Sequence, residues 1–475
     1  MWKYSFIFII GVIFASCQSI SNEWQVYRHA SSLNDTLSYQ AYQYLREHLP
    51  EEKWQYWIKD PDFFTKDLNH VINQNRKQIE NKSLPFNIFA EYILPLQIDQ
   101  EPIENWRKDC LDKFSFCIGK DIVYSCDTIN NLLKKDFGFS LNEPSYTVMP
   151  WSYLNTLKKG DCFHMTKSLL YPLRSLGYPT TIDFTPCWGN TTGAHSWNVV
   201  YVNGKMEPFM GRETGIFKYN PFNTYKFEDS TKKAPGRYPA KIFRKTFSIN
   251  DRLQQIISGI PTTDLPSFLK DCRIKDVTAE YLPVSDITIM IKNKFQKEKL
   301  VYLAVFSNDW TITACSSKKA NGIAVFKDMK KDMLYLPVTY CKGIMFPIDY
   351  PFTINQNGMK RSLEPSDSIE ICRIPYLLPL ITEISAAVAN KDRLPKDIFD
   401  RLYTGEKRKR PTNDEEYSLF YWSNNRWKYI DTKTAANKLL VFPQVPKNAL
   451  FYLADKENKF IGRCFTLNNG EISWW

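Results

Sequence analysis

The chain has 475 residues, which is long enough for two to four domains of ordinary size. Hydrophobic residues make up 43% and charged residues 24%, a globular balance that argues against a disordered chain. The aromatic share of 15% favours β-rich modules. The formal charge of +11 is spread along the chain, and its one dense cluster, 406–410, lacks interleaved aromatic residues. We therefore interpret that cluster as a solvated loop and predict no nucleic-acid partner.

The first 17 residues have the pattern of an export signal. Lys3 supplies a positive charge, and Phe6 to Phe14 form an apolar run too short to span a bilayer permanently. Ala15 and Ser16 then precede Cys17, which resembles the lipobox of bacterial lipoproteins. The resemblance implies a lipid anchor at Cys17 and a place in the cell envelope, on the outer membrane, with the membrane face left open. The alternative is an ordinary cleaved signal peptide followed by a chance cysteine.

Ten cysteines remain after Cys17, and they show no repeated spacing. Many lie in apolar runs, as buried free thiols do. In an exported protein Cys110, Cys117 and Cys126 are the first choice for any disulfide, although the sequence does not fix a pairing. No Cys-x-x-Cys or His-x-x-x-His pattern occurs, so we predict no metal site and no cofactor.

The first half of the chain mixes helices with a few strands. Apolar residues at helical spacing predict helices over 23–49 and 61–79, interrupted at Pro50 and Pro61. Further along, the patterns predict a helix start at 101–107, a helix over 120–136, a helix from about Cys162 to Gly177, a strand at 180–184, and strands at 195–202 and 205–209 around an Asn-Gly turn.

The second half of the chain is dominated by alternating strands. After a helix over 249–269 that breaks at Pro261, the alternation predicts strands at 287–291, 301–306, 311–315, 323–326 and 333–340. Their spacing of about ten residues is typical of an antiparallel sandwich. Prolines and dense charge at 390–414 indicate a linker, and 419–422 with 427–430 are predicted to form a hairpin.

Cys162 and His195 are the candidate catalytic residues. Cys162 follows Gly160 and Asp161 and stands where a helix is predicted to begin. A helix N-terminus stabilises a thiolate through the helix dipole, and a neighbouring imidazolium does so by ion pairing. His195 begins a predicted strand that follows this helix. A cysteine at a helix start that faces a histidine on a strand is the arrangement of papain-like chemistry.

Several short motifs occur in order around this pair. They are Gly160-Asp161-Cys162, Leu176-Gly177-Tyr178-Pro179, Gly193-Ala194-His195-Ser196-Trp197, Asn203-Gly204-Lys205 and Pro208-Phe209. Together they resemble the transglutaminase-like core, whose pattern runs from Gly-x-Cys through a helix to His-x-Trp and a β-hairpin. The resemblance covers about residues 150–212. The arrangement of the chain around it is similar to that of exported bacterial lipoproteins with a central transglutaminase-like domain.

The resemblance implies an α+β fold with a papain/transglutaminase-like core, preceded by helices and followed by antiparallel β-sandwich modules. The predicted division is a signal peptide (1–17), an N-terminal helical region (18–84), a transglutaminase-like domain (85–240), a helical connector (241–275), a β-sandwich domain (276–390), a linker (391–414) and a C-terminal β region (415–475).

The third catalytic position departs from the family pattern. An acid about fifteen residues after the histidine usually orients the imidazole, and here that position falls on or beside Met210. Glu207 is the nearest candidate, although strand alternation places it on the face opposite Met210. Asn198 is an alternative that its strand position disfavours. We also predict that Trp151, Trp188 and Trp197 line a substrate cleft.

The family implies acyl chemistry at an amide. Cys162 attacks a carboxamide or peptide carbonyl, and His195 protonates the departing amine. Hydrolysis is preferred over cross-linking because bacterial members of the superfamily are often peptidases or amidases. The substrate is then a protein, a peptide or a glycan-linked amide. The alternative is a catalytically degenerate scaffold that binds glycan or protein in the cell envelope.

Overall fold

The structure, a computed structural model, describes residues 21–28, 35–143, 149–222, 236–291, 298–317, 322–379, 381–382 and 409–475. The predicted signal peptide, Cys17 and most of the predicted 391–414 linker lie outside these residues. The chain divides into two compact units. Unit 1 comprises Met1–Asp183, Ser196–Tyr219 and Lys245–Ile249, and unit 2 comprises Phe184–His195, Asn220–Arg244 and Asn250–Trp475. The linear domain boundaries stay predictions, because both units are discontinuous in the chain.

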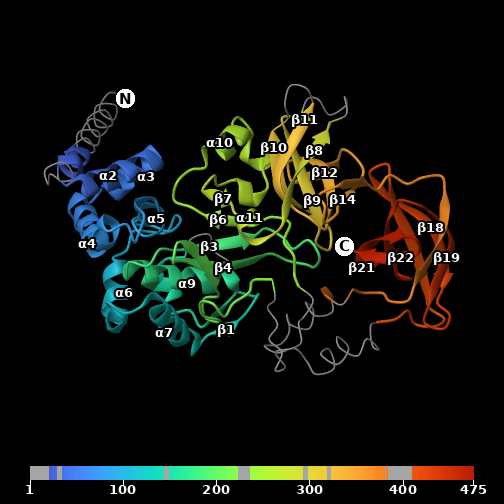
Figure 1. The fold of residues 1–475 in the computed structure, drawn as a ribbon, viewed down its shortest axis with the longest axis horizontal. Coiled ribbons are helices and arrows are strands. Elements are labelled where there is room, and N and C mark those ends of the chain that lie inside the picture. Colours follow the sequence, from blue (N-terminus) through green and yellow to red (C-terminus); the bar gives the residue numbers. More distant parts are fainter. Residues whose placement is uncertain are drawn as a thin grey trace, which may run out of the picture. The chain divides into compact units, whose positions relative to one another are not determined.

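Helices form the first part of unit 1, as predicted (Figure 1). Asp60 caps α4, where Pro61 takes the first position that needs no backbone N–H donor. Pro50 stands one position earlier relative to its helix, as the N-cap of α3. Trp54 and Trp57 are buried in the core that these helices share. The elements are α2 (Thr36–His48), α3 (Glu51–Trp57), α4 (Pro61–Glu80) and α5 (Phe86–Tyr92).

The helix expected to start within 101–107 begins only at Trp106. Glu101 accepts hydrogen bonds from the backbone N–H groups of Ile98 (2.5 Å) and Asp99 (2.9 Å), which holds the preceding chain in a turn. The helix thus starts inside the predicted range but near its end, because this local side-chain bond competes with helix formation. The helices that follow are α6 (Trp106–Phe114), α7 (Ile122–Lys134) and α8 (Trp151–Leu154).

The central motif folds as its sequence predicts. Helix α9 (Cys162–Ser175) tolerates Pro172, and the chain leaves it through Gly177 with a φ of +81°. Strands β4 (His195–Val202) and β5 (Lys205–Phe209) pair antiparallel. Their turn uses Asn203 and Gly204 with φ values of +52° and +85°. The five-stranded sheet has the order β5-β4-β3-β6-β7, with β3 at Thr180–Thr185, β6 at Phe243–Lys245 and β7 at Ile274–Asp276.

Two short strands precede α9 in unit 1. Strands β1 (Gly138–Phe139) and β2 (Lys159–Gly160) pair parallel. The core of α6, α7 and α9 includes Leu169 of α9 and Val200 of β4, so α9 packs on the face of β4 that carries Val200. This packing places the start of α9 beside the start of β4.

In unit 2 the predicted antiparallel sandwich is present. One sheet has the order β10-β9-β12-β14-β15, with β13 paired to β12, and β8 pairs with β11 in a second sheet. Ile289 of β8 and Leu303 of β9 belong to one buried core, so the sheets pack face to face. The strands are β8 (Val284–Met290), β9 (Leu300–Phe306), β10 (Trp310–Ser317), β11 (Ile323–Lys330), β12 (Met333–Cys341), β13 (Ile344–Pro347), β14 (Phe352–Ile354) and β15 (Lys360–Ser362).

The last part of unit 2 is also antiparallel. A five-stranded sheet has the order β18-β17-β20-β21-β22, and β16 pairs with β19. The predicted hairpin pairs Trp422 with Trp427 across the turn. The strands are β16 (Ile369–Ile374), β17 (Glu416–Ser423), β18 (Arg426–Thr434), β19 (Leu440–Pro446), β20 (Leu450–Ala454), β21 (Phe460–Asn468) and β22 (Glu471–Trp474).

The helix predicted over 249–269 is shorter than expected. Helix α10 (Asp251–Ile257) ends before Pro261, and two 3₁₀ turns, Thr262–Asp264 and Ser267–Leu269, each follow a proline. A further short helix, α11, spans Thr278–Tyr281.

Cysteines and helices in the described part of the chain bear on two sequence predictions. Cys110, Cys117 and Cys126 are buried free thiols, so the disulfide that they were the first choice to form is not present. No helix among the described residues is both long and apolar enough to cross a bilayer.

Gly177 provides a test of how the fold closes α9. A Cβ there would lie 2.7 Å from Asn75 Oδ1, whereas a Cβ at Gly119, with a φ of +72°, would meet nothing within 4 Å. We expect Gly119→Ala to lower the free energy of unfolding by about 1 kcal/mol through backbone strain. Gly177→Ala should cost at least about twice as much, because overpacking adds to the strain. Urea denaturation measures the free energy of unfolding of both variants. Equal losses of stability would show that overpacking against the Asn75 side chain adds nothing to the cost of Gly177→Ala.

Candidate active site

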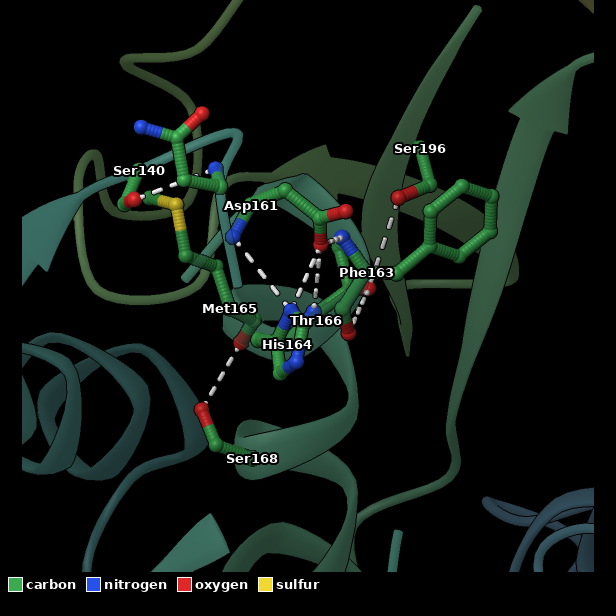
Figure 2. A network of polar contacts seen from close by, with 9 residues as sticks. Ser140, Asp161, Phe163, His164, Met165, Thr166, Ser168 and Ser196 are labelled. Atoms are coloured by element: carbon green, nitrogen blue, oxygen red, sulfur yellow. Dashed lines mark hydrogen bonds and ion pairs between the residues drawn. The ribbon is translucent and has the colours of Figure 1, made fainter. Parts of the chain in front are cut away.

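The start of α9 is held by a reciprocal cap (Figure 2). The Asp161 carboxylate accepts hydrogen bonds from the N–H groups of Phe163 (2.9 Å) and His164 (3.2 Å). His164 Nδ1 lies 2.8 Å from the same carboxylate oxygen and 3.3 Å from the Asp161 N–H. Cys162 is therefore the first residue of a rigid helix end.

Gly160 is needed for this cap. A Cβ at position 160 would lie 2.7 Å from His164 Cβ, closer than real contacts allow. The His164 side chain is fully buried, and its Nε2 has no hydrogen-bond partner among the described residues. His164 thus packs beneath the helix start, and the Gly-x-Cys motif is explained in part by the room that this histidine requires.

The Cys162 sulfur sits beside Ser196. Burial is the largest influence and raises the pKa of Cys162 above its ordinary value of 9.0. The Ser196 hydroxyl lowers that pKa, and the charge of Asp161 raises it. The pKa therefore moves opposite to the direction that a helix start and an imidazole would give it, because desolvation of the sulfur outweighs the hydrogen bonds.

Asn198 joins the start of α9 to β4. Its amide nitrogen donates to the Thr166 carbonyl at 2.9 Å, and its amide oxygen accepts from the Gly211 N–H at 3.2 Å. Thr166 Oγ1 lies 3.5 Å from Ser196 Oγ (Figure 2). Both ends of the buried Asn198 amide therefore hold the helix against the hairpin. These bonds explain why an asparagine stands here without any role at the His195 imidazole.

Ser196 is the site residue that sequence reasoning missed. It occupies the variable position of the His-x-Trp motif, so the motif itself gives no signal for it. Strand alternation provides one: Ser196, Asn198 and Val200 share one face of β4, and Val200 packs in the core with α9. The residue after the histidine is thus directed to the helix that carries the cysteine.

His195 is the first residue of β4 and is counted with unit 2. Its ring stacks on Trp188, with centroids 5.8 Å apart and an angle of 29° between the planes. Burial, assisted by the charge of Arg237, lowers the pKa of His195 to about 3. At this pKa the imidazole is neutral at physiological pH, and it is a weaker base than an ordinary histidine. Its pairing with Cys162, a residue of unit 1, stays a prediction.

Glu207, the predicted third residue, lies on β5 opposite Val200. Its carboxylate forms an ion pair with Lys205 at 2.6 Å. Because side chains alternate along a strand, residues 195 and 200 face opposite ways, and Glu207 shares the face of Val200. This register argues against Glu207 as the residue that orients the imidazole, and that role stays a prediction.

The three tryptophans predicted to line a cleft are buried. The exposed fractions are 3% for Trp151, 1% for Trp188 and 0% for Trp197. Trp151 packs on Phe114 and Tyr171 in the core beneath α9, with ring centroids 6.3 and 5.9 Å away. The observed contacts of these indoles are packing contacts, and their part in substrate binding stays a prediction.

Within the ranges that the structure describes, no group of three His, Cys, Asp or Glu side chains is arranged to hold a metal ion.

Residues 119–208 match the sequence model of the transglutaminase-like superfamily. The matched segment contains Cys162, His195 and nearly all of the β4–β5 hairpin, in the order that the motifs indicated. The chain contains a transglutaminase-like domain. No curated protein matches the chain.

Two solved structures are similar to parts of this chain. A candidate cysteine protease from Cytophaga hutchinsonii is 13% identical, with a TM-score of 0.20, over 24% of this chain and 39% of its own. The chain thus spans about two fifths of that protein. Red sea bream transglutaminase is 10% identical, with a TM-score of 0.23, over 76% of this chain and 72% of its own.

The raised pKa of Cys162 predicts how the thiol reacts with iodoacetamide. Because the thiolate is the reactive form, the labelling rate of Cys162 should keep increasing as the pH rises beyond 9. Ser196→Ala removes a hydrogen bond to the sulfur, so its labelling curve should move to still higher pH.

Peptide mapping by mass spectrometry over a pH series measures both curves. Ser175→Ala, which removes a buried hydroxyl from the other end of α9, is the matched control and should leave the curve in place. A wild-type labelling plateau near pH 6 would show that the thiolate is already formed there, and the direction of the pKa shift would then be wrong.

Proposed function

We propose that the transglutaminase-like domain is a cysteine hydrolase or acyltransferase that acts on amide or peptide carbonyls, with Cys162 as nucleophile and His195 as base. One observation carries the proposal. Cys162 stands at a capped helix start with the hydroxyl and N–H of Ser196 at its sulfur, and Ser196 directly follows His195 in the chain. The family match to residues 119–208 supports the same two residues.

The pKa directions favour a neutral resting pair. His195 takes the thiol proton as the Cys162 sulfur attacks the carbonyl carbon, and it then gives that proton to the departing amine. The products of this half-reaction are a thioester at Cys162 and a free amine. In the second half, His195 removes a proton from water, the resulting oxygen nucleophile attacks the thioester, and the proton returns to the sulfur. Hydrolysis is preferred because water is always present, and an amine in its place gives acyl transfer.

The oxyanion of this reaction needs hydrogen-bond donors. The N–H groups of Phe163 and His164 donate to Asp161 and are therefore committed to the cap. The N–H of Cys162 itself and the two donors of Ser196 lie at the sulfur. We assign the oxyanion to this group of donors.

A second candidate function is a degenerate scaffold that binds protein or glycan. The raised pKa of Cys162 favours it, because a resting thiol is less nucleophilic than a thiolate. The register of Glu207 favours it as well, because no acid of β5 then shares the face of His195. The two candidates differ in whether Cys162 becomes acylated with help from His195.

An activated ester separates these candidates without knowledge of the natural substrate. We expect p-nitrophenyl acetate to acetylate Cys162 in the wild-type protein, seen as one added acetyl group by peptide mapping, and Cys162→Ala to remove that product. His195→Ala should slow acetylation by about 10²- to 10⁴-fold, the usual contribution of a general base.

Two control variants sharpen the measurement. Cys110→Ala removes a buried thiol of the same unit and should not change the rate. Glu207→Gln tests the third position and should also leave the rate unchanged if the register is decisive. Equal rates for wild-type protein and His195→Ala would favour the binding scaffold.

We also propose that the protein is exported and anchored to the outer membrane through lipid on Cys17. The apolar run Phe6 to Phe14 and the small residues before Cys17 support this proposal. The anchor places the domain among proteins, peptides and glycan-linked amides of the cell envelope as substrates, and the membrane face stays open.

Lipidation predicts a specific chemical change. Cells supplied with radiolabelled palmitate should label the wild-type chain, and the labelled chain should sediment with membranes. Cys17→Ser should lose both the label and the membrane association, whereas Cys110→Ser serves as the control cysteine. Export and cleavage of Cys17→Ser at an unchanged rate, together with no label on the wild-type chain, would indicate an ordinary signal peptide.

A further inference from the structure

Arg463, on β21, is a buried cation with an unusual set of partners. Its side chain is 1% exposed. Its Nη2 donates to the carbonyl of Gly189 at 3.0 Å and to the carbonyl of Phe306, and its Nε donates to the carbonyl of Trp475 at 2.5 Å. The three acceptors come from three distant parts of unit 2: the segment before β4, the end of β9 and the end of β22.

Gly189 belongs to residues 186–194, here called the histidine segment because it leads directly into His195. The Trp188 N–H donates to the Gly193 carbonyl at 2.9 Å and closes the segment on itself. Ser307 Oγ donates to the Thr191 carbonyl at 3.1 Å. The segment thus has a fixed shape, and the Trp188 ring within it is the one on which His195 stacks.

The space around Gly189 leaves little freedom. Its N–H donates to the Tyr238 carbonyl at 2.8 Å. A Cβ at this position would lie 2.2 Å from Met333 Sδ and 3.3 Å from the Tyr238 carbonyl oxygen, so a larger residue would require the Met333 side chain to move. The backbone of the histidine segment is therefore closely packed at Gly189. The Arg463 guanidinium bonds the carbonyl of this same residue.

Arg463 is costly to bury. No ion pair of the described residues involves it, and its Nη1 has no hydrogen-bond partner there. Burial also lowers the pKa of Arg463, whose charge is compensated by carbonyl dipoles and by the Phe306 ring, 5.3 Å from its Cζ. An apolar side chain of similar size would fill the space at lower cost. The guanidinium is distinguished by its ability to bond carbonyls of three segments at once.

We propose that Arg463 is a positioning residue, through which the C-terminal β-sheet fixes the histidine segment and the orientation of His195. The C-terminal strands then belong to the catalytic machinery rather than to a separate binding module. The catalytic meaning of this proposal rests on the proposed function, whereas the positioning itself concerns only unit 2.

Arg463→Met in the full chain tests the proposal. Amide hydrogen exchange of the peptide that covers 186–194 should become at least about tenfold faster, because the Gly189 carbonyl loses its donor. The imidazole C2 proton of His195 provides a second readout, since its exchange reports the ionisation of the ring. The midpoint should move from about 3 in the wild-type protein towards the ordinary value of 6.5.

Lys241→Met is the matched control. Lys241 is also a buried cation of unit 2, and its Nζ bonds Asp276 and the carbonyls of Lys327 and Asp328. We expect this variant to be destabilised while the histidine segment and the His195 midpoint stay as in the wild-type protein. Equal effects of Arg463→Met and Lys241→Met on both readouts would overturn the proposal, because a general loss of stability would then explain them.

A milder variant covers the case in which Arg463→Met does not fold. Ser307→Ala removes only the bond to the Thr191 carbonyl, so it should change both readouts in the same direction by a smaller amount. No change in this folded variant would count against a positioned histidine segment.

The acetylation assay separates this proposal from the proposed function. If wild-type Cys162 is acetylated with help from His195, Arg463→Met should slow acetylation while Lys241→Met does not. If Cys162 shows no such reaction, exchange at 186–194 and at His195 still decides whether Arg463 positions the segment.

Discussion

The site depends on the packing of the N-terminal part of α9 against Ser196 and Asn198 of β4. A single buried amide, that of Asn198, holds this contact together by bonding Thr166 on one side and Gly211 on the other. A buried amide left without partners is costly, so the helix and the hairpin are held in one register. The position of Ser196 at the Cys162 sulfur follows from that register, and so does every chemical role assigned to the cysteine.

The packing that positions the Cys162 sulfur also leaves the residue half-buried, which reduces its contact with water. Helix end and hydrogen bonds favour the thiolate, but desolvation of the Cys162 sulfur is the larger effect and raises its pKa. His195 follows the same rule with the opposite sign, because burial disfavours the imidazolium and lowers its pKa to about 3. In the proposed mechanism, two neutral partners resemble the serine and histidine of a hydrolase more than a preformed ion pair. Proton transfer would then accompany the attack, and the proposed reactivity depends on the orientation of the imidazole.

Local chemistry made most of the central fold predictable. Asn203-Gly204 determines the hairpin, and Gly177 determines where the chain leaves α9, because both need positive φ values. Helix α6 starts near the end of the predicted range because Glu101 bonds the backbone ahead of it, which no periodicity reveals. The direction of the Cys162 pKa was missed because burial is a property of the packed fold. Gly189 and Arg463 are 274 residues apart, so their contact has no sequence signal at all.

That separation has a consequence for the order in which the protein is made. A ribosome produces the chain from its N-terminus, so Cys162, its cap and the β4–β5 hairpin emerge long before the strand that carries Arg463. Throughout that interval the Gly189 carbonyl lacks its guanidinium donor, and the loop ahead of the histidine has no tether from the final sheet. On our proposal, a nascent chain therefore carries Cys162 before Arg463 can hold the histidine segment, and synthesis of the last strands completes the proposed site.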